Sequence, residues 1–276
     1  MTYSPGIYAD LTSEEYHADP ALGSTSLKTL ASRTPAHWQY EKANPVHKDI
    51  YDLGTVTHSL ILEGDESGVE VIDVPDKRGA KWTVPAAEAV NAGKIPLKQA
   101  EWDLVRAMRD SVMEHPVAKT AFTGHRAEES VFWEDDGLML KCRPDAWLKD
   151  RLVDLKTTVN ADPREFPKSG FKLGYYQSAA HYQDGVLAMT GERLPFWFVN
   201  VEKTAPHLVS IVEYDDYAME LGRMMNARAK DIYRRCLETG EYPGYPTVEP
   251  ITLPIWAIYQ AEDILGLNIE KEIVIK

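Results

Sequence analysis

Hydrophobic and polar residues alternate along two adjacent segments near the middle of the chain. The first segment covers residues 138–148 and the second covers residues 151–157. Alternation with period two is typical of half-buried β-strands, and only two residues separate the segments. We therefore predict an antiparallel hairpin with a two-residue connection, in which Asp145 lies directly opposite Asp154.

Apolar residues three and four positions apart indicate the helices. The pattern is clearest over residues 97–113, where one stripe consists of Leu97, Trp102, Val105, Met108 and Val112. A long helix over 215–237 is expected to bury Tyr217, Leu221, Met224, Met225, Ala229 and Ile232. Further helices are expected over 24–30, after Pro35, over 50–62, within the ambiguous stretch 77–98, and over 163–189.

The remaining alternating segments predict more strands, over 69–74, 127–133, 195–201 and 207–212, with an edge strand or docking segment at 273–275. Helices followed by a mainly antiparallel strand group, a helix, two strands and a last helix predict an α/β fold of the mixed α+β kind. Its central mixed sheet is flanked by helices. We interpret 1–276 as a single domain, with an N-terminal helical segment (1–50), a core (51–240) and a C-terminal tail (241–276).

Composition narrows the function classes. The chain of 276 residues is 44% hydrophobic and 26% charged, an ordinary globular balance, and no run of apolar residues is long enough for a membrane span. The N-terminus lacks the pattern of a signal peptide, and two cysteines are too few for a disulfide framework, so a cytoplasmic location is expected. A net charge of −13 argues against a simple basic nucleic-acid binder, although an acidic exterior can coexist with a locally basic channel.

The predicted hairpin carries the strongest candidate chemistry. Asp145 and Asp154 would face each other, and Lys156 follows Asp154 by two residues, so all three would project from one face of the hairpin. Two facing carboxylates repel each other unless a positive charge lies between them. A hard divalent cation would provide that charge. The alternative is a surface hairpin with solvated charges, but Asp154 and Lys156 are embedded among apolar residues.

Other candidates are weaker when each is taken alone. His58 lies four residues after Gly54 on an apolar-faced helix, where a histidine is more often structural than a ligand. Glu128 and Glu129 begin a strand, and because strand neighbours face opposite sides, at most one can join the acids. Tyr175, Tyr176, Gln177, His181 and Tyr182 form a polar and aromatic stripe that packing alone would explain.

Taken in order, these residues resemble the PD-(D/E)XK nucleases, and in particular the RecE-type (exonuclease VIII) branch of phage and prophage recombination exonucleases. The resemblance covers roughly residues 24–257. It rests on Ser24-Thr25-Ser26-Leu27, Ser32 to Trp38, Leu53-Gly54-Thr55-Val56-Thr57-His58, Glu128 to Asp135, Cys142-Arg143-Pro144-Asp145, Asp154-Leu155-Lys156-Thr157-Thr158 and Leu253 to Ala257.

The resemblance implies a role for each matching residue. His58, Asp145, Asp154 and the backbone carbonyl of Leu155 would hold Mg²⁺, with Mn²⁺ as a substitute. Glu128, which aligns better than Glu129, would bind a second ion or its water, and Lys156 would orient the attacking water. Gln177 and Tyr182 would contact substrate, although they are five residues apart where the family pairing is four, and Ser178 occupies the expected Gln position. Arg33 would lie near a 5′-phosphate.

The expected activity is a Mg²⁺-dependent exodeoxyribonuclease in the cytoplasm of a bacterial host cell. It would digest linear duplex DNA from 5′ ends and leave 3′ single-stranded tails for recombination. The resemblance also implies a homo-oligomeric ring and a RecT-type single-strand annealing protein as a partner. Two alternatives stay open: a RecB-like single-strand exonuclease or endonuclease, and a non-catalytic DNA-end or recombination adaptor on a nuclease fold.

Overall fold

The computed structural model describes residues 2–44, 50–248 and 250–267. The chain divides into two compact units, Met1–Pro243 and Gly244–Lys276. The second unit contains α11 (Ile255–Leu265), which has no buried residue. The expected segment 273–275 lies outside the described residues. None of the helices in the described ranges is long and apolar enough to cross a membrane.

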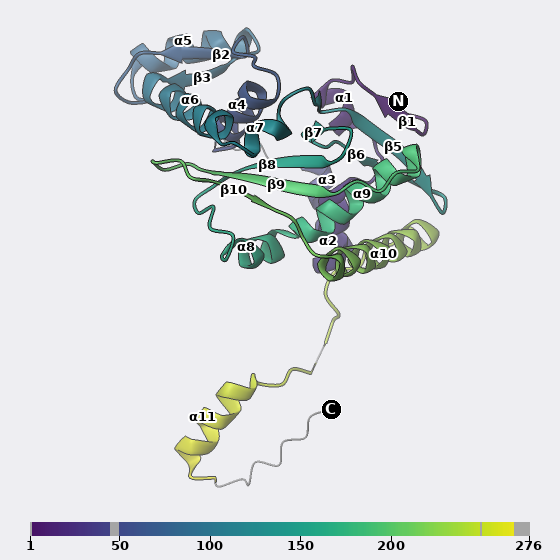
Figure 1. Ribbon diagram of the computed structural model, residues 1–276. Coiled ribbons are helices and arrows are strands. Elements are labelled where there is room, and N and C mark those ends of the chain that lie inside the picture. The colour runs from purple at the N-terminus through teal and green to yellow at the C-terminus, as the bar shows by residue number, and fades with distance from the viewer. Residues whose placement is uncertain (1, 45–49, 249, 268–276) are drawn as a thin grey trace. The chain divides into compact units, whose positions relative to one another are not determined.

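The centre of the first unit is a five-stranded mixed sheet (Figure 1). Its strand order is β10-β9-β8-β7-β4. Strands β8 and β9 are parallel, and the other neighbours are antiparallel. The bounds are β4 (Arg126–Ala127), β7 (Ala146–Trp147), β8 (Leu152–Thr158), β9 (Phe196–Glu202) and β10 (Val209–Val212).

Two smaller sheets accompany it. One has three strands in the order β1-β5-β6, with β1 (Gly6–Tyr8), β5 (Ser130–Asp135) and β6 (Leu138–Cys142). The other pairs β2 (Val69–Ile72) with β3 (Ile95–Lys98) in parallel. The fold is therefore mixed α/β as predicted, but the strands of the described residues are divided among three hydrogen-bonded sheets instead of one.

The predicted strand 138–148 is interrupted, which corrects the sequence-based boundaries. Residues 138–142 form β6 in one sheet and 146–147 form β7 in another. The break includes Pro144, which has no N–H to donate to a ladder. The predicted strand 127–133 is interrupted in the same way, between β4 and β5 at Glu128 and Glu129. Both breaks occur at residues predicted for the site.

Helices cover both faces of the central sheet. Before β4, the first strand of the central sheet, the chain forms α1 (Ser13–Ala18), α2 (Ser24–Ser32), α3 (Pro35–Ala43), α4 (Ile50–Leu62), α5 (Ala80–Asn91), α6 (Gln99–Glu114) and α7 (Ala118–Ala121). After β8 come α8 (Phe166–Leu173), α9 (Tyr175–Thr190) and α10 (Asp216–Thr239). The expected helix 163–189 is thus two helices, because Gly174 adopts a left-handed conformation (φ 65°) between them.

The alternation of β8 divides its side chains between two cores. Leu152 packs in a core with side chains from α2, α9 and α10. Val153 and Leu155 pack in the other core, with side chains from α4 and α6. Because strand period is two, Asp154 and Lys156 lie on the same face as Leu152. The acidic residue and the lysine are therefore directed toward the side of the sheet that α2 and α9 cover.

The inward face of α10 agrees only in part with the predicted one, because Ala229 is buried and Ile232 packs against the core as predicted, but other members of the set are exposed. Tyr217 and Met224 are exposed, at 72% and 61%, and Leu221 is also exposed. The buried residues are Met219, Gly222, Asn226, Ala229 and Cys236. The reason is a close helix crossing, since a Cβ at Gly222 would lie only 2.5 Å from the carbonyl oxygen of Tyr176 on α9. Gly222 therefore lies against α9, and Tyr217, Leu221 and Met224 remain at the surface.

Candidate active site

The hairpin of β7 and β8 places two aspartates opposite each other. Ala146 pairs with Val153, and the Leu148 N–H donates to the Arg151 carbonyl at 2.9 Å. One step further along the same register, Asp145 lies opposite Asp154. The register predicted from the two-residue connection is therefore the one in the structure. Asp145 itself lies just outside the ladder, at the break between β6 and β7.

Each acidic side chain has partners within the cluster. The Asp154 carboxylate forms an ion pair with the Lys156 ammonium. The Leu155 N–H donates to Oδ2 of Asp145 at 2.6 Å. Nδ1 of His58, on α4, lies 3.5 Å from the same Oδ2 atom. Side chains separated by almost a hundred residues along the chain thus meet at the middle of β8. We call Asp145, Asp154, Lys156 and His58 the acidic cluster.

Burial and charge shift the protonation of this cluster. Burial raises the pKa of Asp145 well above its usual value, and the charge of Asp154 raises it further. Burial alone would lower the pKa of Lys156, but the charges of Asp154 and Asp145 outweigh it and raise that pKa. Burial lowers the pKa of His58 to about 4, and the nearby Lys156 charge adds to the effect. At neutral pH, His58 is therefore uncharged and Lys156 is charged.

Glu128 lies at the break between β4 and β5, beside Asp145. Its N–H donates to the Asp145 carbonyl at 3.1 Å, and its own carbonyl accepts from Nε of Arg143 at 2.6 Å. These bonds hold Glu128 at φ 47°, a left-handed conformation that costs free energy for a residue with a Cβ. Glu129 instead pairs with Arg126 at 2.9 Å. Of the two glutamates, the structure brings Glu128 to the acidic cluster.

A cavity of about 470 Å³ opens beside the acidic cluster. It is lined by Ser13, Gly54, Thr55, His58, Ser59, Glu128, Thr157 and Lys203. Its walls come from α1, α4, β8 and the segment after β9, so a substrate inside it would contact several elements at once. Gly54, on α4, has the Thr157 hydroxyl oxygen 3.9 Å from the position of a Cβ. This is an ordinary van der Waals distance, so α4 and β8 are in contact at the cavity wall.

The donor atoms of the cluster fit a hard divalent cation in their chemistry. Carboxylate oxygens and a backbone carbonyl are such ions' preferred ligands, and an uncharged imidazole has a free lone pair. In the described part of the chain, however, no three His, Cys, Asp or Glu side chains are already grouped to hold an ion. Asp145 accepts from a backbone N–H and Asp154 pairs with Lys156, so an ion would compete with these internal partners. The metal site stays a prediction.

Comparison with known proteins gives the family. Residues 23–249 match the family described as "PDDEXK-like domain of unknown function (DUF3799)", which covers most of the chain. The chain belongs to this PDDEXK-like family. The match includes the whole hairpin and all four residues of the acidic cluster. No curated protein matches the chain significantly.

One solved structure shares the fold of the chain over most of its length. A crystal structure from Eubacterium rectale, provisionally assigned as an exonuclease, has a TM-score of 0.64 at 17% identity, covering 91% of this chain and 98% of that one. An alkaline exonuclease (LHK-Exo) from Laribacter hongkongensis has a TM-score of 0.31 at 16% identity, covering 67% of this chain and 95% of that one. The first likeness supports the PD-(D/E)XK nuclease fold, which the motifs of the sequence predicted.

The other residues predicted for substrate contact lie in different surroundings of the PDDEXK-like domain. Gln177 is 3% exposed on α9 and lines a second cavity. Tyr182 packs edge-to-face on Phe196 in the core, and burial followed by nearby charges, including those of both aspartates, raises its pKa. Arg33 forms an ion pair with Glu41 on the surface and is not brought to the acidic cluster.

Two lysines near the acidic cluster were missed by the sequence analysis. Lys203 lines the cavity beside His58 and Glu128. The pKa of Lys28, on α2, is lowered by burial and by repulsion from Lys156, and the charge of Asp154 acts on it in the opposite direction. Lys28 immediately follows the Ser24-Thr25-Ser26-Leu27 motif, which was the available signal. A single lysine on an amphipathic helix is too common to be singled out by pattern alone.

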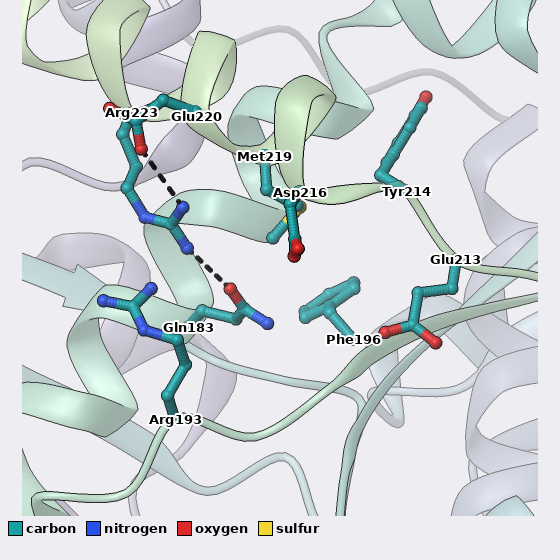
Figure 2. A pocket seen from close by; sticks show the side chains of 9 residues that line it. All are labelled: Gln183, Arg193, Phe196, Glu213, Tyr214, Asp216, Met219, Glu220 and Arg223. Carbon is teal, nitrogen blue, oxygen red and sulfur yellow. Dashed lines mark hydrogen bonds and ion pairs between the residues drawn. The ribbon is translucent and has the colours of Figure 1, made fainter.

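A separate polar cavity of about 380 Å³ lies between α9, β9 and α10 (Figure 2). One of its two basic side chains, Arg223, donates to Oε1 of Gln183 at 2.8 Å and pairs with Glu220 at 3.6 Å. It also donates to Asp184 at 3.1 Å. Because these partners occupy the guanidinium, we interpret this cavity as a junction that fastens α10 to α9.

Proposed function

We propose that this PDDEXK-like protein is a divalent-metal-dependent exodeoxyribonuclease that digests linear duplex DNA from 5′ ends and leaves 3′ single-stranded tails. The observation that carries the proposal is the acidic cluster. Two facing carboxylates, a charged lysine and an uncharged histidine lie together at the middle of β8, beside an open cavity. The PD-(D/E)XK fold and the sequence resemblance to RecE-type exonucleases support the same activity.

Asp145, Asp154, His58 and the Leu155 carbonyl would hold Mg²⁺ or Mn²⁺, with Glu128 at a second ion or its water. A bound ion would supply Lewis-acid polarisation of the scissile phosphate and acidify a water. Within the chain, Asp154 keeps Lys156 charged and directed into the site through their ion pair. The Lys156 ammonium can then orient the attacking water and stabilise charge on the phosphoryl group.

Binding of duplex ends by a homo-oligomeric ring, and cooperation with a RecT-type annealing protein, belong to the same proposal. A ring would reconcile the net charge of −13 with DNA binding, because only its lining need be basic.

The test is digestion of end-labelled linear duplex, linear single-stranded DNA and nicked circular DNA, each with Mg²⁺ and with Ca²⁺. We expect release of nucleotides from 5′ ends of the linear duplex in Mg²⁺ only. Asp154→Asn should lower the rate by about two orders of magnitude or more, because it removes a ligand and the partner of Lys156. Asp150→Asn, in the exposed turn of the same hairpin, is the matched control and should retain activity.

The substrates also separate the alternatives. Faster digestion of linear single-stranded DNA than of linear duplex would favour the RecB-like single-strand exonuclease. Cleavage of the nicked circular DNA would show endonuclease activity. If no nucleotide is released from any substrate in Mg²⁺ or Mn²⁺, the nuclease proposal is wrong and the adaptor alternative remains.

A further inference from the structure

Two hollows share a wall on the α9 side of the central sheet, where α2, α8 and α10 all contact α9. The first, which we call the basic cavity, has a volume of about 410 Å³ and includes Lys28, Lys172 and Gln177 in its lining. The second, which we call the apolar groove, has a volume of about 380 Å³ and is lined by Pro167, Phe171, Tyr176, Tyr214, Ala218, Leu221 and Met225. Phe171, Tyr176 and Met225 line both hollows.

The basic cavity offers several donors to an anion. Lys28 and Lys172 contribute positive charge. The N-terminus of α9 has no side-chain cap, so its first-turn N–H groups and its dipole favour a negative ligand. Gln177 is 97% buried, and its Nε2 atom has no hydrogen-bond partner among the described residues. A buried donor without a partner is costly unless a ligand satisfies it. These features together fit a phosphate group.

The basic cavity lies near the acidic cluster. Lys28 lies close enough to Asp154 and Lys156 for their charges to act on its ammonium. The Lys156 ammonium lies 5.0 Å from the centre of the Tyr175 ring, and Tyr175 is the first residue of α9. Lys28, which lines the basic cavity, and the first residue of α9 therefore both lie close to the acidic cluster.

The apolar groove offers a flat surface beside that cavity. Phe171 is 74% exposed, and its ring lies nearly parallel to that of Tyr176, with centroids 6.0 Å apart and planes inclined by 10°. Tyr214 closes the groove, and its hydroxyl has no hydrogen-bond partner among the described residues. Figure 2 shows its ring directed away from the carboxylates of Glu213 and Asp216. The exposed ring of Phe171, which lies parallel to that of Tyr176, suits the face of a nucleobase.

We propose that these two hollows bind one nucleotide of a single-stranded DNA segment, with its phosphate in the basic cavity and its base against Phe171 and Tyr176. The proposal rests on the nuclease function proposed above, since the bound strand is the one that continues into the acidic cluster. The charged hollow and the apolar hollow share three lining residues, so they are direct neighbours, as the phosphate and the base of one nucleotide are. A docked protein helix would use the groove alone and leave the lysines and Gln177 without a role.

The test measures binding by fluorescence anisotropy in EDTA, with Asp154→Asn as the parent protein so that no cleavage occurs. The probes are a labelled single-stranded oligothymidylate and an abasic oligomer of the same length. Phe171→Ala should weaken oligothymidylate binding by about tenfold, because one stacked base is lost, and should leave abasic binding unchanged. Phe171→Trp should retain binding. Lys172→Gln should weaken the binding of both probes and reduce the salt dependence of that binding by about one phosphate contact.

The matched control is Tyr40→Ala, which removes an aromatic ring that is 69% exposed on α3. It should leave both affinities unchanged. Equal binding of oligothymidylate by the parent and by Phe171→Ala would overturn the proposal, whatever the wild type does to duplex DNA. If Phe171→Ala instead alters the sedimentation of the protein and not its affinity for DNA, the groove is a protein interface and the proposal is wrong. Conversely, base-dependent binding without any nuclease activity would support this site and refute the proposed function.

Discussion

His58 provides a direct test of the electrostatics of the acidic cluster. Its ring lies 3.5 Å from Asp145 and its pKa is lowered from 6.5 to about 4, mainly by burial. A histidine that is harder to protonate in the folded state than in the unfolded state stabilises the fold while it is uncharged. That contribution is complete above the unfolded pKa of 6.5. It is lost as the pH falls through the folded pKa.

The size of the effect follows from the pKa difference. At pH 4 an unfolded His58 is almost fully protonated and a folded one is about half protonated, so the protein should lose about 3 kcal/mol of unfolding free energy through this group between pH 7.5 and pH 4. His58→Asn removes the titration. We expect the stability difference between wild type and variant to change by about this amount over the same pH range.

The assay is urea unfolding at half-unit pH intervals in EDTA, so that metal binding does not contribute. His115→Asn, at the C-terminal end of α6, is the control for removal of a histidine outside the acidic cluster. A wild-type minus His58→Asn difference that stays constant within about 0.5 kcal/mol from pH 7.5 to pH 4 would show that His58 is not buried uncharged beside the acids.

Three further substitutions test the acidic cluster and the crossing of α9 and α10. Asp145→Asn should raise the midpoint of thermal unfolding at neutral pH in EDTA. Burial and Asp154 raise the pKa of Asp145, so ionisation of Asp145 weakens the fold as the pH rises. The gain in midpoint should vanish below about pH 3.8, and an unchanged midpoint at pH 7 would contradict this prediction. Lys156→Met should lower the free energy of unfolding in urea by about 3 kcal/mol, because it leaves two buried carboxylates without a cation. Adding Asp154→Asn should restore part of that free energy. If the effects of the two substitutions simply add, the ion pair does not stabilise the fold. Gly222→Ala should cost about 1–3 kcal/mol by the same assay, because its Cβ would lie 2.5 Å from a helix carbonyl, whereas Gly68→Ala, with nothing within 4 Å, should be nearly neutral.

The helix α10 shows where a sequence pattern fails. Its spacing of large apolar residues predicted an inward face that included Tyr217 and Met224, both of which are exposed. The physical reason is that helix packing selects for close approach as well as for apolar area, and Gly222 permits an approach that no large residue allows. The misplaced face is informative, because Leu221 is one of the residues that line the apolar groove.

The broken strands show a different limit. Alternation over residues 138–148 was continuous, yet the chain passes from one sheet to another at Arg143, Pro144 and Asp145. The local sequence predicted strands on both sides of the break. It contained no information about which neighbour each piece would pair with, because β5 and β8 are both suitable antiparallel partners.

Local sequence alone was sufficient for the hairpin, the facing aspartates and the helix 99–114, because each depends on a short connection or on a period that neighbouring residues impose. The meeting of His58 with Asp145, the left-handed Glu128, and the arrival of Lys28 and Phe171 beside Gln177 depend on how α2, α4 and α8 pack on the sheet and on α9. Those contacts join residues far apart in the chain, and their free energy comes from burial against surfaces that no local pattern describes. Tertiary packing therefore decided what surrounds the catalytic candidates.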